Sequence, residues 1–168
     1  MGDVTLDDYL IHGPREAMDV IGEITGALKI DIIGLCLGGA LTAMLAAYLA
    51  EKGDTYVVGA VNDHIVPWHG SYKTGGLMGG NVRYVLSSGG HIAGIVNPPG
   101  PKAWYEAADH AGPHPEAWRQ SNSKHRGSWW EDWTTWAGAR AGERIKPPAM
   151  GSRRHRAIGD APGEYVFG

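Results

Sequence analysis

Three side chains with complementary chemistry stand at separate points of this sequence, each shortly after an apolar run. Cys36 is the only cysteine among the 168 residues and lies in the stretch "KIDIIGLCLGG". Asp63 follows "TYVVGAVN", and His91 follows "VRYVLSSGG". A thiol, an imidazole and a carboxylate are the groups that nucleophilic catalysis uses, with the histidine as base and the carboxylate as its partner. The three residues are therefore candidate catalytic groups.

The residues around Cys36 predict a tight turn from a strand into a helix. The pattern Gly-x-Cys-x-Gly runs from Gly34 to Gly38, and glycines are needed beside such a turn because side chains there would clash. The positive end of the following helix would favour the thiolate, and the backbone N–H of Leu37 could donate to a developing oxyanion. The alternative is a buried structural cysteine at a strand–helix turn.

The order of the three residues along the chain, nucleophile then acid then histidine, is that of α/β-hydrolases. If the preceding runs are parallel strands, all three side chains lie at the carboxyl ends of those strands, where open α/β sheets place their sites. Asp63 has an alternative role as a turn or cap residue, and His91 as a loop histidine bonded to backbone. His64 is a rival base because it is adjacent to Asp63.

Apolar runs alternate with helix-like segments over the first part of the chain, which predicts an α/β fold with a short parallel sheet. Residues 100–168 are rich in Trp, Pro and Gly, and we expect a C-terminal extension with short helices around Glu116 and over 130–141. The chain is thus expected to form one domain over 1–168, with a core over 1–99 that carries the three candidates. The expected elements are a helix over 5–26, a strand Ile30–Ile33, a helix over 37–53, a strand over 55–61, a short helix or turn over 71–80, and a strand Val82–Leu86.

Composition excludes several classes of protein. The formal net charge of -3 argues against a nucleic-acid partner, which would favour a strongly basic face. A single cysteine forms no internal disulfide, which points to the reducing cytoplasm. The beginning, "MGDVTLDDYL", lacks the order of a signal peptide, and no apolar run reaches the length of a transmembrane segment.

Several stretches together give the chain a specific resemblance. It resembles the poly(3-hydroxyalkanoate) synthases, class I members most closely, and ordinary hydrolases lack both the loop "HIAGIVNPP" and the Trp-rich tail. The matching stretches are "IIGLCLGGAL", "YVVGAVNDHIVPWHGSY", "GGNVRYVLSSGGHIAGIVNPP", "GSWWEDWTTWAGARAGE" and "HRAIGDAPGEYVFG".

The resemblance implies a partial α/β-hydrolase fold in which the family nucleophile falls on Cys36, its acid on Asp63 and its histidine on His91. It implies polymerisation of (R)-3-hydroxyacyl-CoA into a storage polyester, with release of CoA and with no metal or other cofactor. It also implies a location in the cytoplasm or on polyester granules, with a second copy of the chain or the granule surface as partner.

Departures from the family pattern are equally specific. Family members are considerably longer, and their N-terminal domain and first sheet strands have no counterpart in this sequence. The cap insertion that precedes the Asp strand is also missing, because "AEKGD" leads directly into "TYVVGAVNDH". The chain thus resembles an internally deleted, C-terminal piece of a synthase. Two alternatives to a synthase follow: a non-catalytic remnant that binds a full-length synthase or a granule, or a weak acyl-CoA thioesterase.

Two questions about roles stay open at the level of sequence. The hydroxyl of the incoming acyl unit needs a base, which is either Asp63 directly or His91 oriented by Asp63. Tryptophans could provide an apolar surface for an acyl chain, although plain core packing is the commoner role of such residues. These tryptophans are Trp68, Trp129, Trp130, Trp133 and Trp136.

Overall fold

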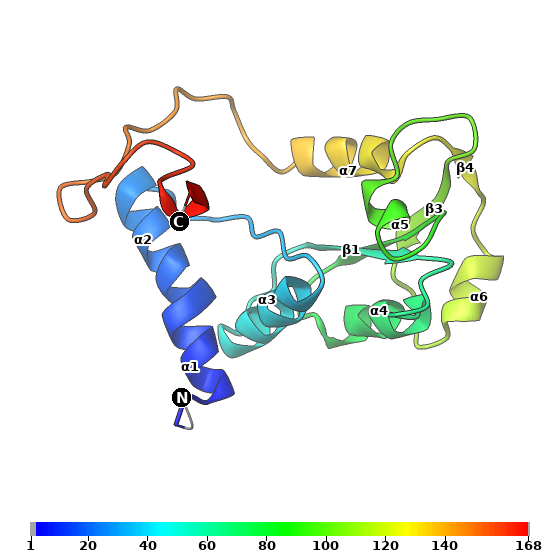
Figure 1. The fold of residues 1–168 in the computed structure, drawn as a ribbon. Helices are drawn as coiled ribbons and strands as arrows, with labels where there is room; N and C mark the ends of the chain where they lie inside the picture. Colours follow the sequence, from blue (N-terminus) through cyan, green and yellow to red (C-terminus); the bar gives the residue numbers. More distant parts are fainter. Residues whose placement is uncertain (1–2, 168) are drawn as a thin grey trace. The chain divides into compact units, whose positions relative to one another are not determined.

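The structure, a computed structural model, describes residues 3–167 and divides into two compact units (Figure 1). One unit takes in the residues up to Leu45 and those from Arg144 onward, and the other spans Ala46–Glu143. Each unit has its own packing. The boundary falls within one helix, α3 (Leu37–Tyr48).

The first unit begins with a helical stretch that a proline interrupts. Pro14 has no N–H and its ring crowds the preceding turn, so the backbone widens into a π-helical segment in which Gly13 leaves the helical region. Gly26, with a φ of 70°, ends the stretch in the left-handed conformation, as the sequence predicts. The stretch consists of α1 (Leu6–Leu10), the π segment η1 (Ile11–Arg15) and α2 (Glu16–Thr25).

Side chains from the C-terminal segment attach to α2 within the same unit. The carboxylate of Glu23 accepts hydrogen bonds from Arg154 Nη1 and pairs with His155 Nε2, each at 2.7 Å. A short helical turn, η3 (Tyr165–Phe167), lies near the end of the chain. Over residues 3–167, no helix combines the length and the apolar character that crossing a lipid bilayer requires.

The prediction of a strand over Ile30–Ile33 is wrong. Residues 29–35 have no regular secondary structure, and Ile33 is 72% exposed. A strand needs a partner for its backbone groups, and Asp31 and Gly34 leave only a very short apolar run to pair. This segment belongs to the first unit, whereas the sheet belongs to the second.

The second unit is built on a four-stranded sheet with the order β1-β2-β3-β4. β1 and β2 are parallel, in register from Thr55 opposite Val82 to Ala60 opposite Ser87. β2 and β3 are antiparallel, as are β3 and β4. The strands are β1 (Thr55–Ala60), β2 (Val82–Ser87), β3 (Trp104–Asp109) and β4 (His125–Arg126).

Helices cover both faces of this sheet (Figure 1). Successive strand residues point to opposite faces. Tyr84 and Leu86 therefore point to the same face. On that face they form a buried core with three aromatic side chains from α4 and α6: Trp68, Tyr72 and Trp118. The opposite face of β1 and β2 packs on α7 through the residues described below. The helices are α4 (Trp68–Thr74), the turn η2 (Gly75–Leu77), α5 (Ala93–Val96), α6 (Pro115–Gln120) and α7 (Trp129–Gly138).

The predicted mixture of helices and strands is confirmed, but the sheet is mostly antiparallel rather than parallel. Residues after 100 supply both antiparallel strands and were expected to contain none. Glu106 lies in the middle of β3 and is only 2% exposed. This charged residue interrupts the apolar pattern by which a buried strand is predicted. Arg119 Nε lies 3.4 Å from the carboxylate of Glu106 and offsets its charge. The expected short helices around 116 and over 130–141 correspond to α6 and α7.

Candidate active site

Two loops leave the carboxyl ends of the parallel strands β1 and β2 side by side. The loop after β1 carries Asp63, and the loop after β2 carries His91. The backbone N–H of Asn62 donates to the carbonyl of Gly89 at 2.9 Å, which continues the strand pairing into the loops. Gly89 has a φ of 108°, and a Cβ there would lie 2.9 Å from the backbone nitrogen of Gly94. The turn therefore requires glycine.

Both carboxylate oxygens of Asp63 accept hydrogen bonds. Oδ1 accepts the backbone N–H groups of Ile65 and Val66, each at 2.9 Å, so Asp63 also serves as the turn residue that the alternative interpretation expected. Oδ2 lies 2.8 Å from His91 Nδ1. The side chain of Asp63 is 9% exposed and that of His91 is 27% exposed. The imidazole is therefore held on one side and accessible on another.

The carboxylate determines which ring nitrogen carries the proton. Burial alone would raise the pKa of Asp63, but the N–H of Val66, the ring of His91 and the N–H of Ile65 together lower it below its usual range. An ionised carboxylate only accepts hydrogen bonds, so Nδ1 of His91 must be the donor. This arrangement places the lone pair of the neutral imidazole on Nε2, where a general base needs it.

Cys36 stands in a tight turn that leads directly into α3. It is exposed and has a φ of 53°, which is unusual for a residue with a side chain. A Cβ at Gly34 would lie 2.5 Å from the carbonyl oxygen of Gly38, so this close approach requires glycine. Leu37 is the first residue of α3. The turn has the strained backbone expected of a nucleophile elbow, although it follows an irregular segment instead of a strand.

The structure brings two of the predicted site residues into contact. Asp63 and His91 form a hydrogen-bonded pair within the sheet unit. Cys36 and Leu37 belong to the other unit, so contact between the thiol and His91 stays a prediction. His64, the rival base, is exposed, and the partner of Asp63 is His91. Among residues 3–167, no cluster of three or more His, Cys, Asp or Glu side chains is placed to hold a metal ion.

The short helix α5, which follows His91, is seated between β1 and α7. Gly94 lies so close to β1 that a Cβ would overlap the methyl group of Ala60. From the other side, Trp129 Nε1 donates to the carbonyls of Gly94 at 3.1 Å and Ile95 at 3.0 Å. Trp130 Nε1 donates to the carbonyl of Val96 at 3.1 Å. The sequence indicated no such polar role for these tryptophans.

Replacing Gly94 should disturb the contact between α5 and β1. We expect Gly94→Ala to lower the free energy of unfolding by about 2 kcal/mol, because the added methyl group overpacks the contact with Ala60. Thermal melting followed by circular dichroism measures the loss. Gly70→Ala in α4 is the matched control, since no atom lies within 4 Å of its Cβ position. It should leave the melting temperature unchanged or raise it, because alanine favours helix. Equal melting temperatures for the two variants would contradict the close contact.

Tryptophans of the second unit have divided roles. Trp68 and Trp129 are each 5% exposed, which agrees with core packing, whereas Trp130 is 40% exposed. Trp133 packs edge-on against Trp130, with ring centroids 5.5 Å apart. Trp136 contacts the ring of Tyr56 at 5.2 Å. Most of this aromatic surface therefore packs within the protein.

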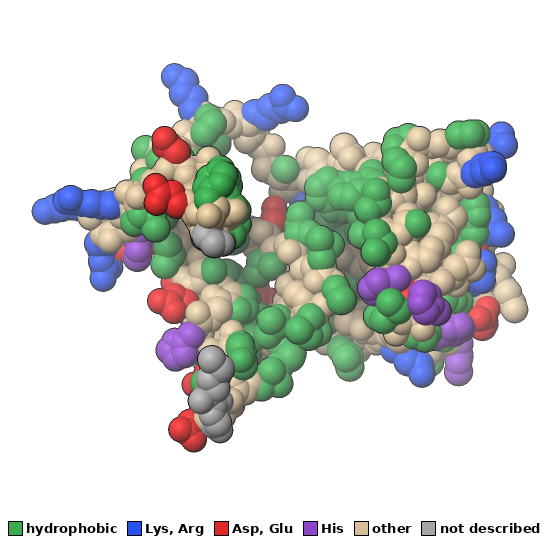
Figure 2. All heavy atoms as spheres, viewed as in Figure 1, with side chains coloured by type: hydrophobic (Ala, Val, Ile, Leu, Met, Phe, Trp, Pro, Cys, Tyr) green, Lys and Arg blue, Asp and Glu red, His purple; other side chains and the backbone are tan. Residues whose placement is uncertain are grey.

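Exposed apolar side chains flank the Asp63–His91 pair in sequence. We call these residues the apolar rim: Ile65 and Val66 in the first loop, and Ile92 and Val96 beside His91. All four are exposed. On the face that Figure 2 shows, hydrophobic side chains of the sheet unit border histidine side chains. An apolar surface beside a histidine suits a ligand with a hydrocarbon portion.

An ion-pair network fastens α7 to the sheet. Asp132 accepts two hydrogen bonds from Arg83, with Nε at 2.7 Å from Oδ2 and Nη2 on Oδ1. The hydroxyl of Tyr56 donates to the same carboxylate at 2.8 Å. Burial and the hydrogen bond to Asp132 raise the pKa of Tyr56, which keeps its hydroxyl a donor. The helix that contacts α5 is thereby attached to both β1 and β2.

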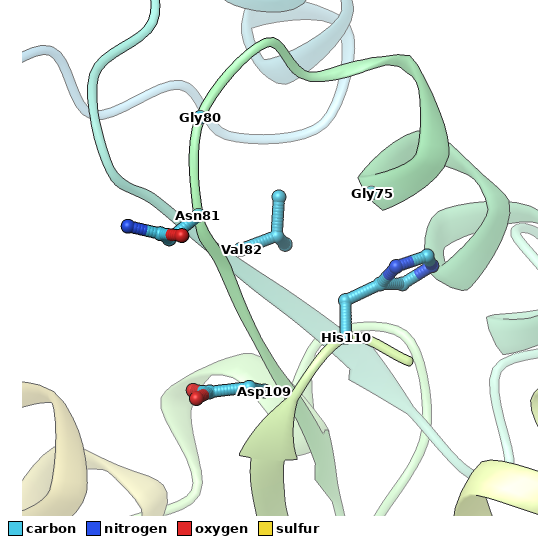
Figure 3. Close-up of a pocket in the computed structure, with 6 residues that line it drawn as sticks. All are labelled: Gly75, Gly80, Asn81, Val82, Asp109 and His110. Atoms are coloured by element: carbon cyan, nitrogen blue, oxygen red, sulfur yellow. The ribbon is translucent and has the colours of Figure 1, made fainter. Parts of the chain in front are cut away.

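A cavity of about 210 Å³ lies at the other end of the sheet (Figure 3). Val82 and Asp109 on its wall are the first residue of β2 and the last residue of β3, whereas His91 follows the opposite end of β2. His110 Nε2 is buried there without a hydrogen-bond partner in the described part of the chain. The cavity is separate from the Asp63–His91 pair. Its lining residues are Gly75, Gly80, Asn81, Val82, Asp109 and His110.

Comparison with known proteins finds relatives that are all named as poly(3-hydroxyalkanoate) polymerases. Poly(3-hydroxyalkanoate) polymerase 1 of Ectopseudomonas oleovorans is 47% identical over 118 residues, which cover 68% of this chain and 21% of that polymerase. Poly(3-hydroxyalkanoate) polymerase subunit PhaC of Cupriavidus necator is 43% identical over 114 residues, covering 67% of this chain and 19% of the relative. The polymerase of Methylorubrum extorquens is 40% identical over 106 residues, which cover 62% and 18% respectively. No protein-family model matches the sequence.

These relatives agree with the resemblance inferred from the motifs. The chain is poly(3-hydroxyalkanoate) synthase-like and matches a partial form of such a polymerase. It spans about a fifth of the length of the first two relatives, 21% and 19%.

Proposed function

We propose that this chain is an acyltransferase of the poly(3-hydroxyalkanoate) synthase type that acts on (R)-3-hydroxyacyl-CoA and releases CoA. The hydrogen-bonded pair of Asp63 and His91 carries the proposal, because it leaves Nε2 as the basic nitrogen of a side chain that is 27% exposed. The similarity to polymerases and the apolar rim add support. Polyester is the proposed product, and a second copy of the chain or the surface of a granule is the proposed partner.

In the proposed first step, Nε2 of His91 removes the proton from Sγ of Cys36. The thiolate attacks the carbonyl carbon of the thioester, and the backbone N–H of Leu37 donates to the oxyanion. The bond from carbon to the CoA sulfur then breaks, and His91 returns the proton to the departing thiolate. The products are free CoA and an acyl group held as a thioester on Cys36.

In the second step, the 3-hydroxyl of another acyl unit attacks this thioester. We assign the base to His91 instead of Asp63. Both oxygens of Asp63 already accept hydrogen bonds, from Ile65, Val66 and His91, so the carboxylate serves best as the group that orients the imidazole. His91 takes the proton of this hydroxyl as the oxygen attacks the acyl carbon. The new ester bond forms as the bond from that carbon to Sγ of Cys36 breaks, and His91 passes the proton to the departing thiolate.

The proposed architecture is a partial α/β-hydrolase domain over 1–168. Its core over 1–99 would carry Cys36, Asp63 and His91, and the extension over 100–168 would complete the sheet with β3 and β4. The parallel pair β1 and β2 supports this arrangement, because the Asp63 and His91 loops both leave its carboxyl ends. Contact between Cys36 and His91 is the element that the proposal adds.

Incubation of the purified chain with (R)-3-hydroxybutyryl-CoA tests the proposal. Mass spectrometry should detect an acyl adduct on Cys36, and chromatography should detect an equal or greater amount of free CoA. Cys36→Ala should give neither. Successive additions of hydroxybutyrate units would mark chain growth, whereas free 3-hydroxybutyrate would mark a thioesterase. Absence of both adduct and CoA release from the wild-type chain would refute the proposal.

A further inference from the structure

We infer that the indole N–H groups of Trp129 and Trp130 hold His91 in position by capping the helix that follows it. Only the effect of this contact on acyl transfer rests on the proposed function. The contact itself is a property of the sheet unit, and it assigns these two tryptophans a role as positioning residues.

The argument starts from the shortness of α5. A helix leaves its last four carbonyls without partners inside the helix, and α5 has only four residues. The carbonyl of Ala93 accepts the N–H of Asn97 at 2.8 Å. The following three carbonyls, of Gly94, Ile95 and Val96, accept the two indole N–H groups. Every carbonyl of the helix therefore has a donor, and three of the four depend on α7.

The position of α5 determines that of His91, because only Ile92 separates them in sequence. The first turn of the helix reaches back across the histidine, since Gly94 N donates to the carbonyl of Gly90 at 2.7 Å. A shift of α5 would therefore move the ring relative to Asp63. An orienting bond of 2.8 Å tolerates little displacement before it breaks.

The two tryptophans are themselves well anchored. Their rings stack with centroids 4.3 Å apart, and Ser128, which is fully buried, accepts the backbone N–H of Trp130 at 3.2 Å. The network of Asp132 with Arg83 then attaches α7 to the sheet. A continuous series of contacts therefore runs from the sheet through α7 and α5 to His91.

Trp129→Phe tests the inference because it keeps an aromatic ring and removes the N–H donor. The readout is the rate at which the His91 Nδ1 proton exchanges with water, followed by NMR on the full chain and assigned by its loss in His91→Ala. We expect this rate to rise about tenfold, since the buried carbonyl of Gly94 and the half-buried carbonyl of Ile95 lose their donor. Trp136→Phe, in the same helix, should change it less than about twofold, because Trp136 contacts Tyr56 and Arg140 instead of α5.

Trp130→Phe provides a second test that is less demanding of the fold, because Trp130 is 40% exposed. It should raise the exchange rate about threefold to fivefold, since one carbonyl loses its donor. An unchanged exchange rate in a folded Trp129→Phe variant overturns the inference. If that variant does not fold, an unchanged rate in Trp130→Phe does so.

Acylation of Cys36 by (R)-3-hydroxybutyryl-CoA separates this inference from the proposed function. If both hold, Trp129→Phe lowers kcat for CoA release about tenfold with little change in KM, because the base is displaced while substrate contacts remain. Faster proton exchange in a protein whose wild type is never acylated would refute the proposed function and support the positioning role. Normal acylation together with unchanged exchange in Trp129→Phe would refute the positioning role alone.

Discussion

Asp63→Asn is expected to reduce the rate of CoA release from (R)-3-hydroxybutyryl-CoA by about 10³- to 10⁴-fold. The amide oxygen can still accept the N–H groups of Ile65 and Val66, so the loop should keep its shape. The amide nitrogen would instead donate to Nδ1 of His91. The imidazole would then carry its proton on Nε2 and could no longer accept one from Cys36.

Single-turnover measurement of acyl-enzyme formation by mass spectrometry gives the rate directly. Asp109→Asn is the matched control, because it makes the same change from carboxylate to amide at another site. The side chain of Asp109 is 90% exposed at the end of β3. It should retain the wild-type rate. A variant Asp63→Asn that kept more than about a tenth of the rate would show that Asp63 does not set the tautomer of His91.

Asp132→Ala is expected to lower the free energy of unfolding by about 2–3 kcal/mol. The substitution removes both hydrogen bonds to Arg83 and leaves the hydroxyl of Tyr56 without its acceptor. Breaking a fully buried pair costs about 3–5 kcal/mol. The expected value is smaller because the side chain of Arg83 is still 27% exposed to solvent. Urea unfolding of the two proteins measures the difference.

Asp109→Ala is the matched control for this prediction. Asp109 approaches the same guanidinium, with Arg83 Nη1 at 3.7 Å, but its side chain is exposed. Its loss should cost less than about 0.5 kcal/mol, as for other surface ion pairs. Equal losses for the two aspartates would mean that the Asp132 contact contributes no more than a surface pair.

The stabilisation by Asp132 should depend on pH in one direction. Burial raises the pKa of Asp132, but the hydrogen bonds from Arg83 and Tyr56 outweigh it, and the net pKa in the folded protein is lowered. A group of this kind stabilises the folded state fully above its unfolded pKa of about 3.9 and loses that contribution as the pH falls through the lower folded value. The stability difference between the wild type and Asp132→Ala should therefore be constant near neutral pH and shrink below about pH 4.

The meeting of Asp63 with His91 was predictable because each follows an apolar run that forms a parallel strand. Parallel neighbours place their carboxyl ends at one edge of the sheet, so the two loops had to approach each other. Gly89 was visible in the sequence, and it permits the turn that leads to the histidine. The helix end at Gly26 was predictable for a similar local reason.

The remaining features depended on contacts that spacing in the sequence does not reveal. Ile30–Ile33 had the residue types of a strand but no partner in the structure. β3 was missed because Glu106 occupies a buried position, where it pairs with Arg119. Core packing was the commoner role expected of Trp129. Its hydrogen bonds could not be expected, because the carbonyls that accept its N–H lie 34 and 35 positions earlier in the chain.

The pairing of β1 with β2 makes the length of these strands a requirement for the contact between Asp63 and His91. The ladder runs from Thr55 opposite Val82 to Ala60 opposite Ser87, and the bond between Asn62 and Gly89 lies just beyond its end. One residue inserted within β2 would advance His91 by about 3.3 Å and reverse the faces of the side chains beyond it. Asp63 would keep its place while its partner moved out of reach. Evolution or protein engineering can therefore exchange residues within these strands more readily than it can insert or delete one.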